Sequence, residues 1–206
     1  MATQYFNKKD IASMESRHRV HFINSLSGYK SANLIGTVDK LGVTNLSIVS
    51  SVVHLGADPA LIAFVSRPQS VERNTLDNID TIGDYTINHV PADYFKDAHH
   101  TSARYPADIS EFDQTNFTEM YTELKAPYVE QSKIKMGVKL RQKTDIQLNG
   151  TVFVIGEIVE VIIKNDIISD DGKIDLTQAQ SVAVSGLDEY HTAQSLGRLA
   201  YAKPKK

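Results

Sequence analysis

The stretch from Asn33 to Pro68 reads NLIGTVDKLGVTNLSIVSSVVHLGADPALIAFVSRP, and its pattern indicates β structure. Residues 31–38 predict a strand that runs into a turn at residues 39–42, where a glycine can take positive φ. Residues 43–55 are rich in β-branched side chains but do not alternate cleanly, which predicts a strand followed by irregular backbone. This part of the chain therefore predicts a hairpin.

The next segments predict a buried strand and a helix. Residues 56–59 break the pattern, and the continuously apolar residues 60–66 are typical of a short strand inside a core. Ser70 is placed to cap a helix over residues 71–82, and Gly83 is placed to end it.

The second half of the chain returns to β structure after a long segment without strand patterns, residues 91–131, which we call the excursion. Residues 84–90 predict another strand, whereas residues 91–131 predict short helical pieces and loops of the kind that often carry function. Residues 134–140 and the long apolar run 151–163 predict two strands, with a turn between them at residues 148–150. A run of that length suits a barrel better than a small flat sheet.

The end of the chain predicts a last strand, a turn, a short polar segment and an apolar patch that includes a half-buried Tyr201. We find no internal repeat and no low-complexity linker. The sequence predicts a mainly β protein, a β-barrel with a few helices, in which residues 1–206 form a single domain.

The composition narrows the classes of function. The 206 residues are 41% hydrophobic and 23% charged, with a net charge of -3, so a broad positive field for nucleic acid is not expected. No apolar run is long enough for a bilayer, and the start lacks a signal-peptide core, so we expect a cytoplasmic protein without a membrane partner. Zero cysteines exclude disulfides, thiolate nucleophiles and iron–sulfur ligation.

Hydroxyl and guanidinium groups gather around the predicted helix start. Arg67 precedes the helix, and its first turns carry Ser70, Arg73, Asn74 and Thr75. Helix N-terminal amides together with Arg and hydroxyl side chains suit a phosphate monoester. The alternative is that Ser70 only caps the helix and that the two arginines are solvated surface charges.

The chain resembles the flavin reductase-like family, whose members bind FMN in a split β-barrel. The resemblance begins with the quoted run and continues, in the same order, over roughly residues 20–204. The other pieces that carry it are RNTLDNI, GDYTINHV, HHTSARYP, KAPYVEQSKIKMGVKL, LNGTVFVIGEIVEV, VSGLDEYH and LGRLAYAKP.

The resemblance implies bound FMN, NADH or NADPH as electron donor, and a homodimer with active sites near the subunit interface. It places the polar edge of the flavin ring on the backbone of Thr44, Asn45, Leu46 and Ser47, and it places Ser50 and Ser51 beside the ribityl chain or phosphate. The remaining predicted FMN-binding residues are Ser66, Arg67, Arg73, Asn74 and Thr75 around the phosphate, and Thr101 and Ser102 from the neighbouring subunit.

The implied activity is transfer of a hydride from the nicotinamide to FMN, for which no acid–base triad is required. A catalytic residue is not evident, and His191 is only a candidate for contact with nicotinamide or flavin. Two alternatives stay open: an FMN-binding electron-transfer protein that serves a downstream acceptor protein, and a barrel that binds another small molecule.

Other polar clusters favour structural interpretations. His99 and His100 are adjacent and have no carboxylate at a helical ligand spacing, so we predict a loop pair and no metal site. The serine-rich run SIVSS is not a GxSxG elbow, which disfavours a hydrolase. The acidic residues from Asp166 to Asp175 lack the ligand spacing of a calcium loop.

Overall fold

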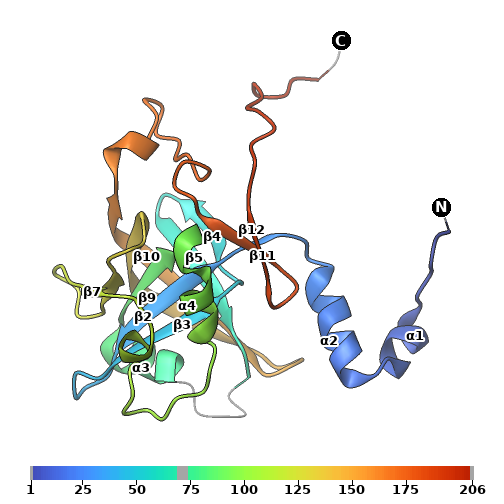
Figure 1. The fold of residues 1–206 in the computed structure, drawn as a ribbon, viewed down its shortest axis with the longest axis horizontal. Helices are drawn as coiled ribbons and strands as arrows, with labels where there is room; N and C mark the ends of the chain where they lie inside the picture. The colour runs from blue at the N-terminus through green and yellow to red at the C-terminus, as the bar shows by residue number, and fades with distance from the viewer. Residues whose placement is uncertain (1, 69–73, 205–206) are drawn as a thin grey trace.

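The computed structural model describes residues 2–68 and 74–204, and its centre is a seven-stranded antiparallel sheet (Figure 1). The sheet has the order β3-β2-β6-β9-β10-β5-β4. Its strands are β2 (Asn33–Val38), β3 (Thr44–Val49), β4 (Val53–Ala57), β5 (Ala60–Ser66), β6 (Asp84–His89), β9 (Ile134–Ile146) and β10 (Thr151–Ile163). The prediction of a mainly β barrel with few helices is confirmed.

Two hairpins lie where the sequence predicts them. Strands β2 and β3 pair from Asn33 opposite Val49 to Val38 opposite Thr44, and Gly42 takes φ 90° in the turn between them. Strands β9 and β10 pair over their whole length through a turn at Gly150, where φ is 72°. Turn chemistry and runs of β-branched and apolar residues were sufficient to place both.

The chain crosses from β3 to β4 through residues 50–52, and this crossover is bonded to β5. The Ser51 hydroxyl donates to the Val65 carbonyl at 2.9 Å and accepts from the Val65 N–H at 3.1 Å. Ser51 lies opposite Val65 if the β4–β5 register, Val53 opposite Ala63, is extended by two residues. The Ser51 side chain thus continues the β4–β5 pairing into the crossover and ties the crossover to the end of β5.

The barrel interior is one apolar cluster covered by helix α3 (Asn74–Ile82). Leu76 and Ile79 of α3 pack with Phe64, Tyr85 and other buried side chains from the strands. The helix ends at Gly83, as predicted, with φ 82° and an N–H that donates to the Ile79 carbonyl. The predicted start of this helix, residues 70–73, lies outside the described residues.

A second apolar cluster lies on the other face of β2 and β3. It includes Leu34, Leu46, Phe112 and Val182 and joins α4 (Phe95–His100) and η2 (Glu111–Gln114) to a small sheet. The small sheet contains β1 (Lys30–Ser31), β11 (Val182–Ser185) and β12 (Glu189–Thr192). The excursion also contains η1 (Ala92–Tyr94) and the paired strands β7 (Glu119–Met120) and β8 (Tyr128–Val129), and η3 (Asn165–Ile167) follows β10.

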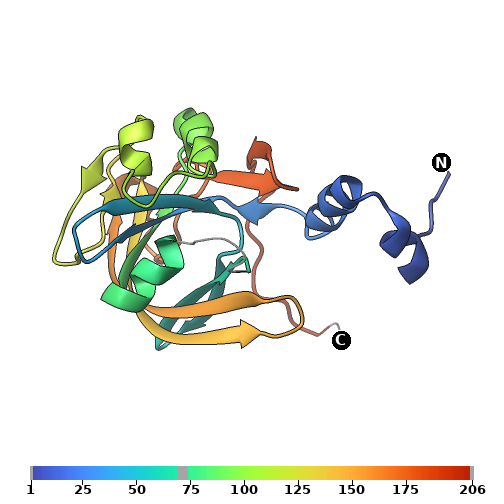
Figure 2. The same cartoon turned by 90° about the horizontal axis from the view of Figure 1, so that it is seen from below.

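Both ends of the chain leave this body. Helices α1 (Lys8–Ser13) and α2 (Ser16–Ser25) contain no buried residue and project away from the barrel (Figures 1 and 2). The C-terminal segment after β12 also projects, and Tyr201 is 93% exposed. The prediction of a half-buried Tyr201 is therefore wrong, because nothing in the described chain covers that residue.

Two further predictions need correction. The break predicted at residues 56–59 begins later, because β4 runs through Gly56 at a β-bulge and the chain turns at Asp58 and Pro59. His99 and His100 are not in a loop, since they form the last turn of α4. Among the described residues, no helix combines the length and apolar character that a membrane crossing requires.

Candidate functional site

The free edge of β3 carries the first group of predicted flavin-binding residues. Leu46 is fully buried and belongs to the cluster under α4, whereas Asn45 points toward α3. Thr44 is also buried, and its hydroxyl contacts Ser110 Oγ at 2.7 Å and donates to Glu119 at 2.5 Å. Thr44 and Asn45 thus form an ordered polar rim along β3, with Leu46 packed beneath it.

A buried carboxylate holds this rim. Glu111 is 5% exposed, and its Oε2 accepts from Asn45 Nδ2 at 2.7 Å and from the Leu46 N–H at 2.8 Å. Burial raises the pKa of this carboxyl, while the two donors from β3 act in the opposite direction. Glu111 therefore satisfies the outward N–H of an edge strand and fixes the position of Asn45.

Sequence reasoning missed Glu111. It lies 65 positions from Leu46 in the chain, inside the excursion, and no local pattern links the two. The only signal was Ser110, because a serine just before Glu111 and Phe112 is typical of the start of a short helix. In the structure Ser110 Oγ accepts from the Phe112 N–H.

A chain of hydroxyls joins β3 to the described start of α3. Thr75 Oγ1 donates to Asn45 Oδ1 at 2.8 Å, and Ser47 Oγ lies 2.9 Å from Thr75 Oγ1. Because the single Thr75 proton is used toward Asn45, Ser47 is the donor to Thr75. Both hydroxyl protons are then engaged within the protein, and these residues position α3 against β3.

Further side chains that could donate hydrogen bonds to an anion lie beyond β3, in the crossover to β4 and at the end of β5. Ser50 is half-buried, and its hydroxyl makes no hydrogen bond to the described residues, while Ser51 is engaged by Val65. Ser66 and the exposed Arg67 follow Val65 directly. The crossover and the end of β5 are thus side by side, and Asn74 begins the described part of α3.

The structure therefore bonds Thr75 to Asn45 and Ser47 and holds Ser51 beside Val65, the residue before Ser66 and Arg67. We give the name crossover surface to residues 44–47, 50–51, 66–67 and 74–75, of which Thr44, Asn45 and Leu46 are buried. Its hydroxyl groups and Arg67 suit a phosphate monoester in donor chemistry. Arg73, the other predicted guanidinium, lies outside the described residues. Two hollows of the described surface, of about 320 and 200 Å³, lie elsewhere, between residues 173–181 and 192–195.

Thr101 supports β3 within the same chain, whereas Ser102 bonds to the end of α4. The Thr101 hydroxyl accepts from the Ile48 N–H at 3.0 Å and donates to the Ala98 carbonyl at 2.8 Å. Ser102 Oγ donates to the His99 carbonyl at 2.7 Å and is exposed. Thr101 thus accepts from a second N–H on the edge of β3, two residues beyond the one that Glu111 binds. The contact of Thr101 or Ser102 with a neighbouring subunit's flavin stays a prediction.

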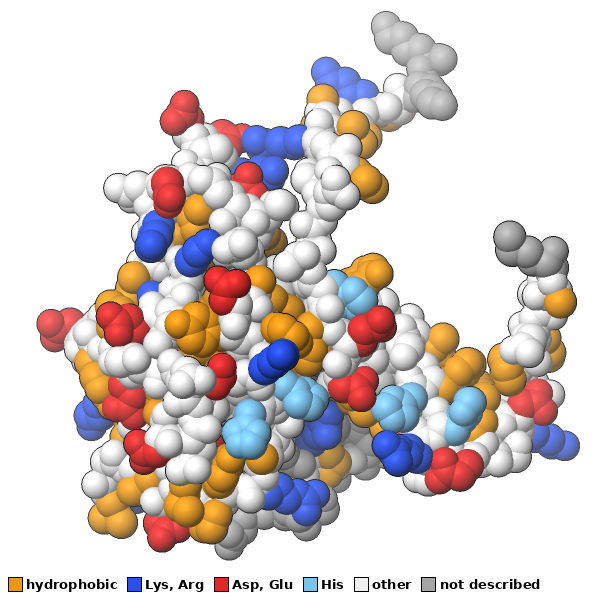
Figure 3. Space-filling model, viewed as in Figure 1, with side chains coloured by type: hydrophobic (Ala, Val, Ile, Leu, Met, Phe, Trp, Pro, Cys, Tyr) orange, Lys and Arg blue, Asp and Glu red, His pale blue; other side chains and the backbone are white. Residues whose placement is uncertain are grey.

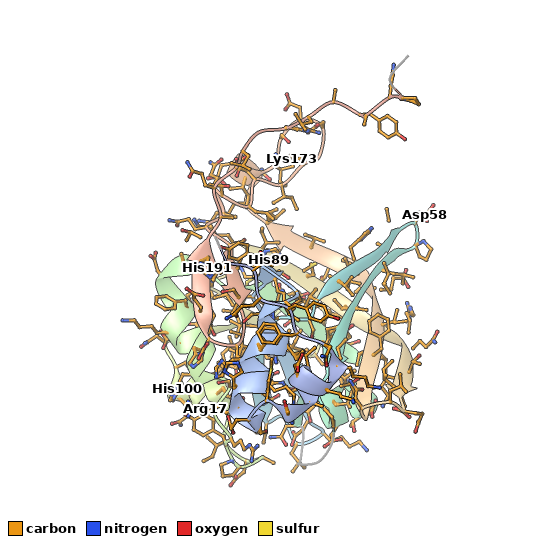
Figure 4. The ribbon with its side chains drawn as sticks, turned by 90° about the vertical axis from the view of Figure 1, so that its right-hand side faces the viewer. Arg17, Asp58, His89, His100, Lys173 and His191 are labelled. Atoms are coloured by element: carbon orange, nitrogen blue, oxygen red, sulfur yellow. The ribbon has the colours of Figure 1, made fainter. Side chains whose placement is uncertain are left out.

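His191 lies on β12, in the small sheet. Its Nε2 is 2.9 Å from Ser185 Oγ, and its ring packs edge-on against Tyr29 with centroids 4.8 Å apart (Figure 4). None of the polar contacts of this ring involves a residue of the crossover surface. A catalytic contact of His191 with nicotinamide or flavin stays a prediction.

The other histidines are occupied by aromatic and hydroxyl partners. His99 Nδ1 lies 2.9 Å from Tyr190 Oη, and His100 Nε2 lies 2.6 Å from Tyr105 Oη. Within residues 2–68 and 74–204, no three His, Asp or Glu side chains gather in a way that could hold a metal ion.

His89 makes stability depend on pH. Burial lowers the pKa of this imidazole from 6.5 to about 4, and its Nδ1 lies 3.0 Å from Ser181 Oγ. The folded protein holds the neutral form, so its stability is complete above pH 6.5 and is lost as the pH falls toward 4. We expect this residue alone to lower the free energy of unfolding by about 1 kcal/mol per pH unit in that window.

The measurement is urea unfolding of the wild type and of His89→Gln at several pH values. The glutamine variant should show a flatter pH dependence across the window, and parallel curves for the two proteins would contradict the assignment.

The fold and the crossover surface together define a split-barrel protein with a polar, anion-suited surface at its split. Residues 26–177 match the family model described as the flavin reductase like domain. The chain therefore belongs to the flavin reductase-like family, as the sequence motifs predicted.

Comparison with solved structures supports the same family. A candidate flavin reductase with a split barrel domain from Shewanella frigidimarina NCIMB 400 is 51% identical, with a TM-score of 0.94, and the match covers 97% of this chain and 100% of that one. Comparison with curated proteins gives no match.

Two more distant structures share the fold. Nitrilotriacetate monooxygenase component B from Bacillus cereus is 18% identical, with a TM-score of 0.85 over 97% of this chain and 100% of that one. Flavoredoxin of Desulfovibrio vulgaris (Miyazaki F) is 21% identical, with a TM-score of 0.74 over 85% of this chain and 92% of that one.

Proposed function

We propose that the chain binds FMN on the crossover surface and acts as an NAD(P)H-dependent flavin reductase in the cytoplasm. The observation that carries the proposal is the bonding of the β3–β4 crossover to the end of β5 in a member of the flavin reductase-like family. The Ser51 bonds to Val65 hold the crossover beside the end of β5, so Ser50, Ser66 and Arg67 can address one small anion.

Bound FMN would supply the hydride-accepting chemistry, with NADH or NADPH as donor. The protein's own contribution is positioning. Glu111 and Thr101 fix the edge of β3, and Thr75 fixes α3 against Asn45, so the residues that would hold the flavin are rigidly placed. Residues 44–47 and the hydroxyl of Ser50 would then orient the flavin, although the Leu46 N–H is already bonded to Glu111 and is not among the available donors.

Reduced FMN would need an electron acceptor. Either free flavin or a protein partner would approach the crossover surface to accept the electrons. The name of the Bacillus cereus structure, a monooxygenase component, and that of the flavoredoxin support a downstream acceptor protein. We propose a homodimer as the functional unit.

Removal of the Arg67 guanidinium tests the phosphate part of the proposal. We expect Arg67→Ala to weaken FMN binding by about 1.5–3 kcal/mol, because a charge-assisted partner of the phosphate is lost. The measurement is a fluorescence titration of flavin-free protein with FMN, in which binding quenches the flavin emission.

Arg141→Ala is the matched control, because Arg141 lies on β9 and pairs with Glu157 on the surface. It should leave the FMN affinity unchanged. An Arg67→Ala protein that binds FMN as tightly as the wild type would remove Arg67 from the site. Riboflavin, which lacks the phosphate, should bind both arginine variants and the wild type equally.

A further inference from the structure

Glu111 is a buried carboxylate that no cation neutralises within the described chain. It bonds to Asn45 and Leu46, which belong to the crossover surface. None of the described Lys, Arg or His side chains forms an ion pair with it. A carboxylate that is buried without a cation keeps its charge only through its hydrogen bonds. The charge on Glu111 therefore depends on a balance that a second charge nearby can change.

The two oxygens of this carboxylate have different surroundings. Oε2 accepts both bonds from β3, whereas Oε1 accepts from no other described residue. The buried side-chain atoms without a partner in the described chain are Asn33 Oδ1 and Tyr85 Oη. Since Glu111 Oε1 is not one of them, it keeps a narrow contact with water. A proton can therefore reach Oε1 while Oε2 keeps both of its donors, so the strand edge need not rearrange.

Hydrogen bonds and burial act on this carboxylate more than neighbouring charges do. Strand β3, which packs on η2, carries no titratable side chain. The other titratable groups on the described elements around η2 are Asp108 just before it, Asp113 on η2 itself, Glu119 on β7, Tyr94 on η1, Tyr190 on β12, and Asp97, His99 and His100 on α4. Burial is the largest influence on the pKa of Glu111 and raises it, while backbone N–H groups and Asn45 lower it, and none of these neighbours is among the causes.

Other carboxylates are less suited to respond to a new charge at the crossover surface. Glu119 also bonds to β3, but it is only half-buried and accepts from two hydroxyls, those of Thr44 and Tyr121. On the face drawn in Figure 3, acidic and basic side chains are interspersed over the surface of the body, where water screens their charges. A new charge would therefore act most strongly on Glu111.

We propose that Glu111 takes up one proton when the flavin on the crossover surface is reduced. This inference rests on the proposed function. A hydride carries two electrons and one proton, so its transfer adds one unit of negative charge to the site that Asn45 and Leu46 border. A like charge disfavours the carboxylate form, so a proton from water adds to Oε1 and gives a neutral carboxyl. The site then gains two electrons and two protons in total.

Proton uptake by Glu111 makes the midpoint potential of the flavin depend more steeply on pH. Burial raises the pKa of Glu111 above 4.5 before reduction, and the added charge raises it further. Between these two pKa values the group is charged in the oxidised protein and neutral in the reduced protein. In that window the potential falls with rising pH by an additional 30 mV or so per pH unit, since a tenfold change in a two-electron equilibrium corresponds to about 30 mV.

The experiment is a spectroelectrochemical titration of the FMN-bound full chain from about pH 5 to about pH 8, in which an electrode supplies the electrons. Glu111→Gln keeps an acceptor oxygen but cannot take up a proton. Its potential should lie above that of the wild type at high pH and meet it at low pH, with one proton fewer taken up in the window. Glu123→Gln removes an exposed carboxylate and should follow the wild type.

Equal slopes for the wild type and Glu111→Gln would overturn this inference and leave the proposed function intact. A chain that takes up no FMN overturns both. A chain that binds FMN but is not reduced by a nicotinamide still tests Glu111, because the electrode replaces the nicotinamide.

Infrared difference spectroscopy of the wild type is a second measurement, and it decides if Glu111→Gln does not fold or retain FMN. Reduction should produce the band of a protonated carboxyl that shifts when the protein is labelled with ¹³C-glutamate. Reduction without such a band overturns the inference.

Discussion

Replacement of Glu111 by alanine will lower the free energy of unfolding by about 2–4 kcal/mol, because it leaves two buried donors on β3 without an acceptor. These donors are Asn45 Nδ2 and the Leu46 N–H, both of which now bond to Glu111 Oε2. Urea unfolding at neutral pH measures the loss. The FMN affinity should fall in the same variant, since the displaced strand edge belongs to the proposed flavin surface.

Two controls separate the lost acceptor from the lost side chain. Glu111→Gln keeps an acceptor oxygen and should cost about 1 kcal/mol. Glu123→Ala removes an exposed glutamate and should change stability by less than about 0.5 kcal/mol. Equal stability of the wild type and Glu111→Ala would show that the carboxylate does not hold β3.

Gly36→Ala is expected to destabilise the barrel by roughly 3 kcal/mol, because the added methyl group meets backbone that cannot move freely. A Cβ at Gly36 would lie 2.2 Å from the Pro127 carbonyl oxygen and 2.5 Å from Thr86 Oγ1. These two atoms are already joined by a 2.6 Å hydrogen bond, which the methyl group would force apart. The measurement is again urea unfolding.

Gly56→Ala is the matched control, since Gly56 also lies in a strand but its added Cβ would only approach the Pro59 carbonyl at 3.2 Å. This change should cost less than about 1 kcal/mol. Similar losses in both variants would mean that the effect comes from glycine in a strand and not from the close approach of Pro127.

The parts of the fold that the sequence predicted are those set by local chemistry. The β2–β3 hairpin depends on β-branched residues and on Gly42, and the end of α3 depends on Gly83, so neighbouring residues were sufficient to place both. Helices α1 and α2 were not predicted, because their apolar residues contact no core and give no clear stripe.

The candidate site was predicted less completely than the fold. The motifs named residues 44–51 and 66–75, but they could not show that Thr101 and Glu111 hold the edge of β3, since those bonds span 53 and 65 positions of the chain. They also could not show that the Ser51 hydroxyl bonds to the backbone of Val65, and the contact of Ser51 with flavin stays a prediction. Such roles depend on tertiary pairing, which no local pattern encodes.

The central claim is that this chain of the flavin reductase-like family binds FMN and reduces it with a nicotinamide. The most direct test is anaerobic stopped-flow spectroscopy of the FMN-loaded protein mixed with NADH or NADPH. The proposal predicts rapid loss of the flavin absorbance bands with at least one of the two nucleotides, at a rate that saturates with nucleotide concentration. An unchanged flavin spectrum with both nucleotides would contradict the reductase, and a protein that takes up no FMN would contradict the site itself.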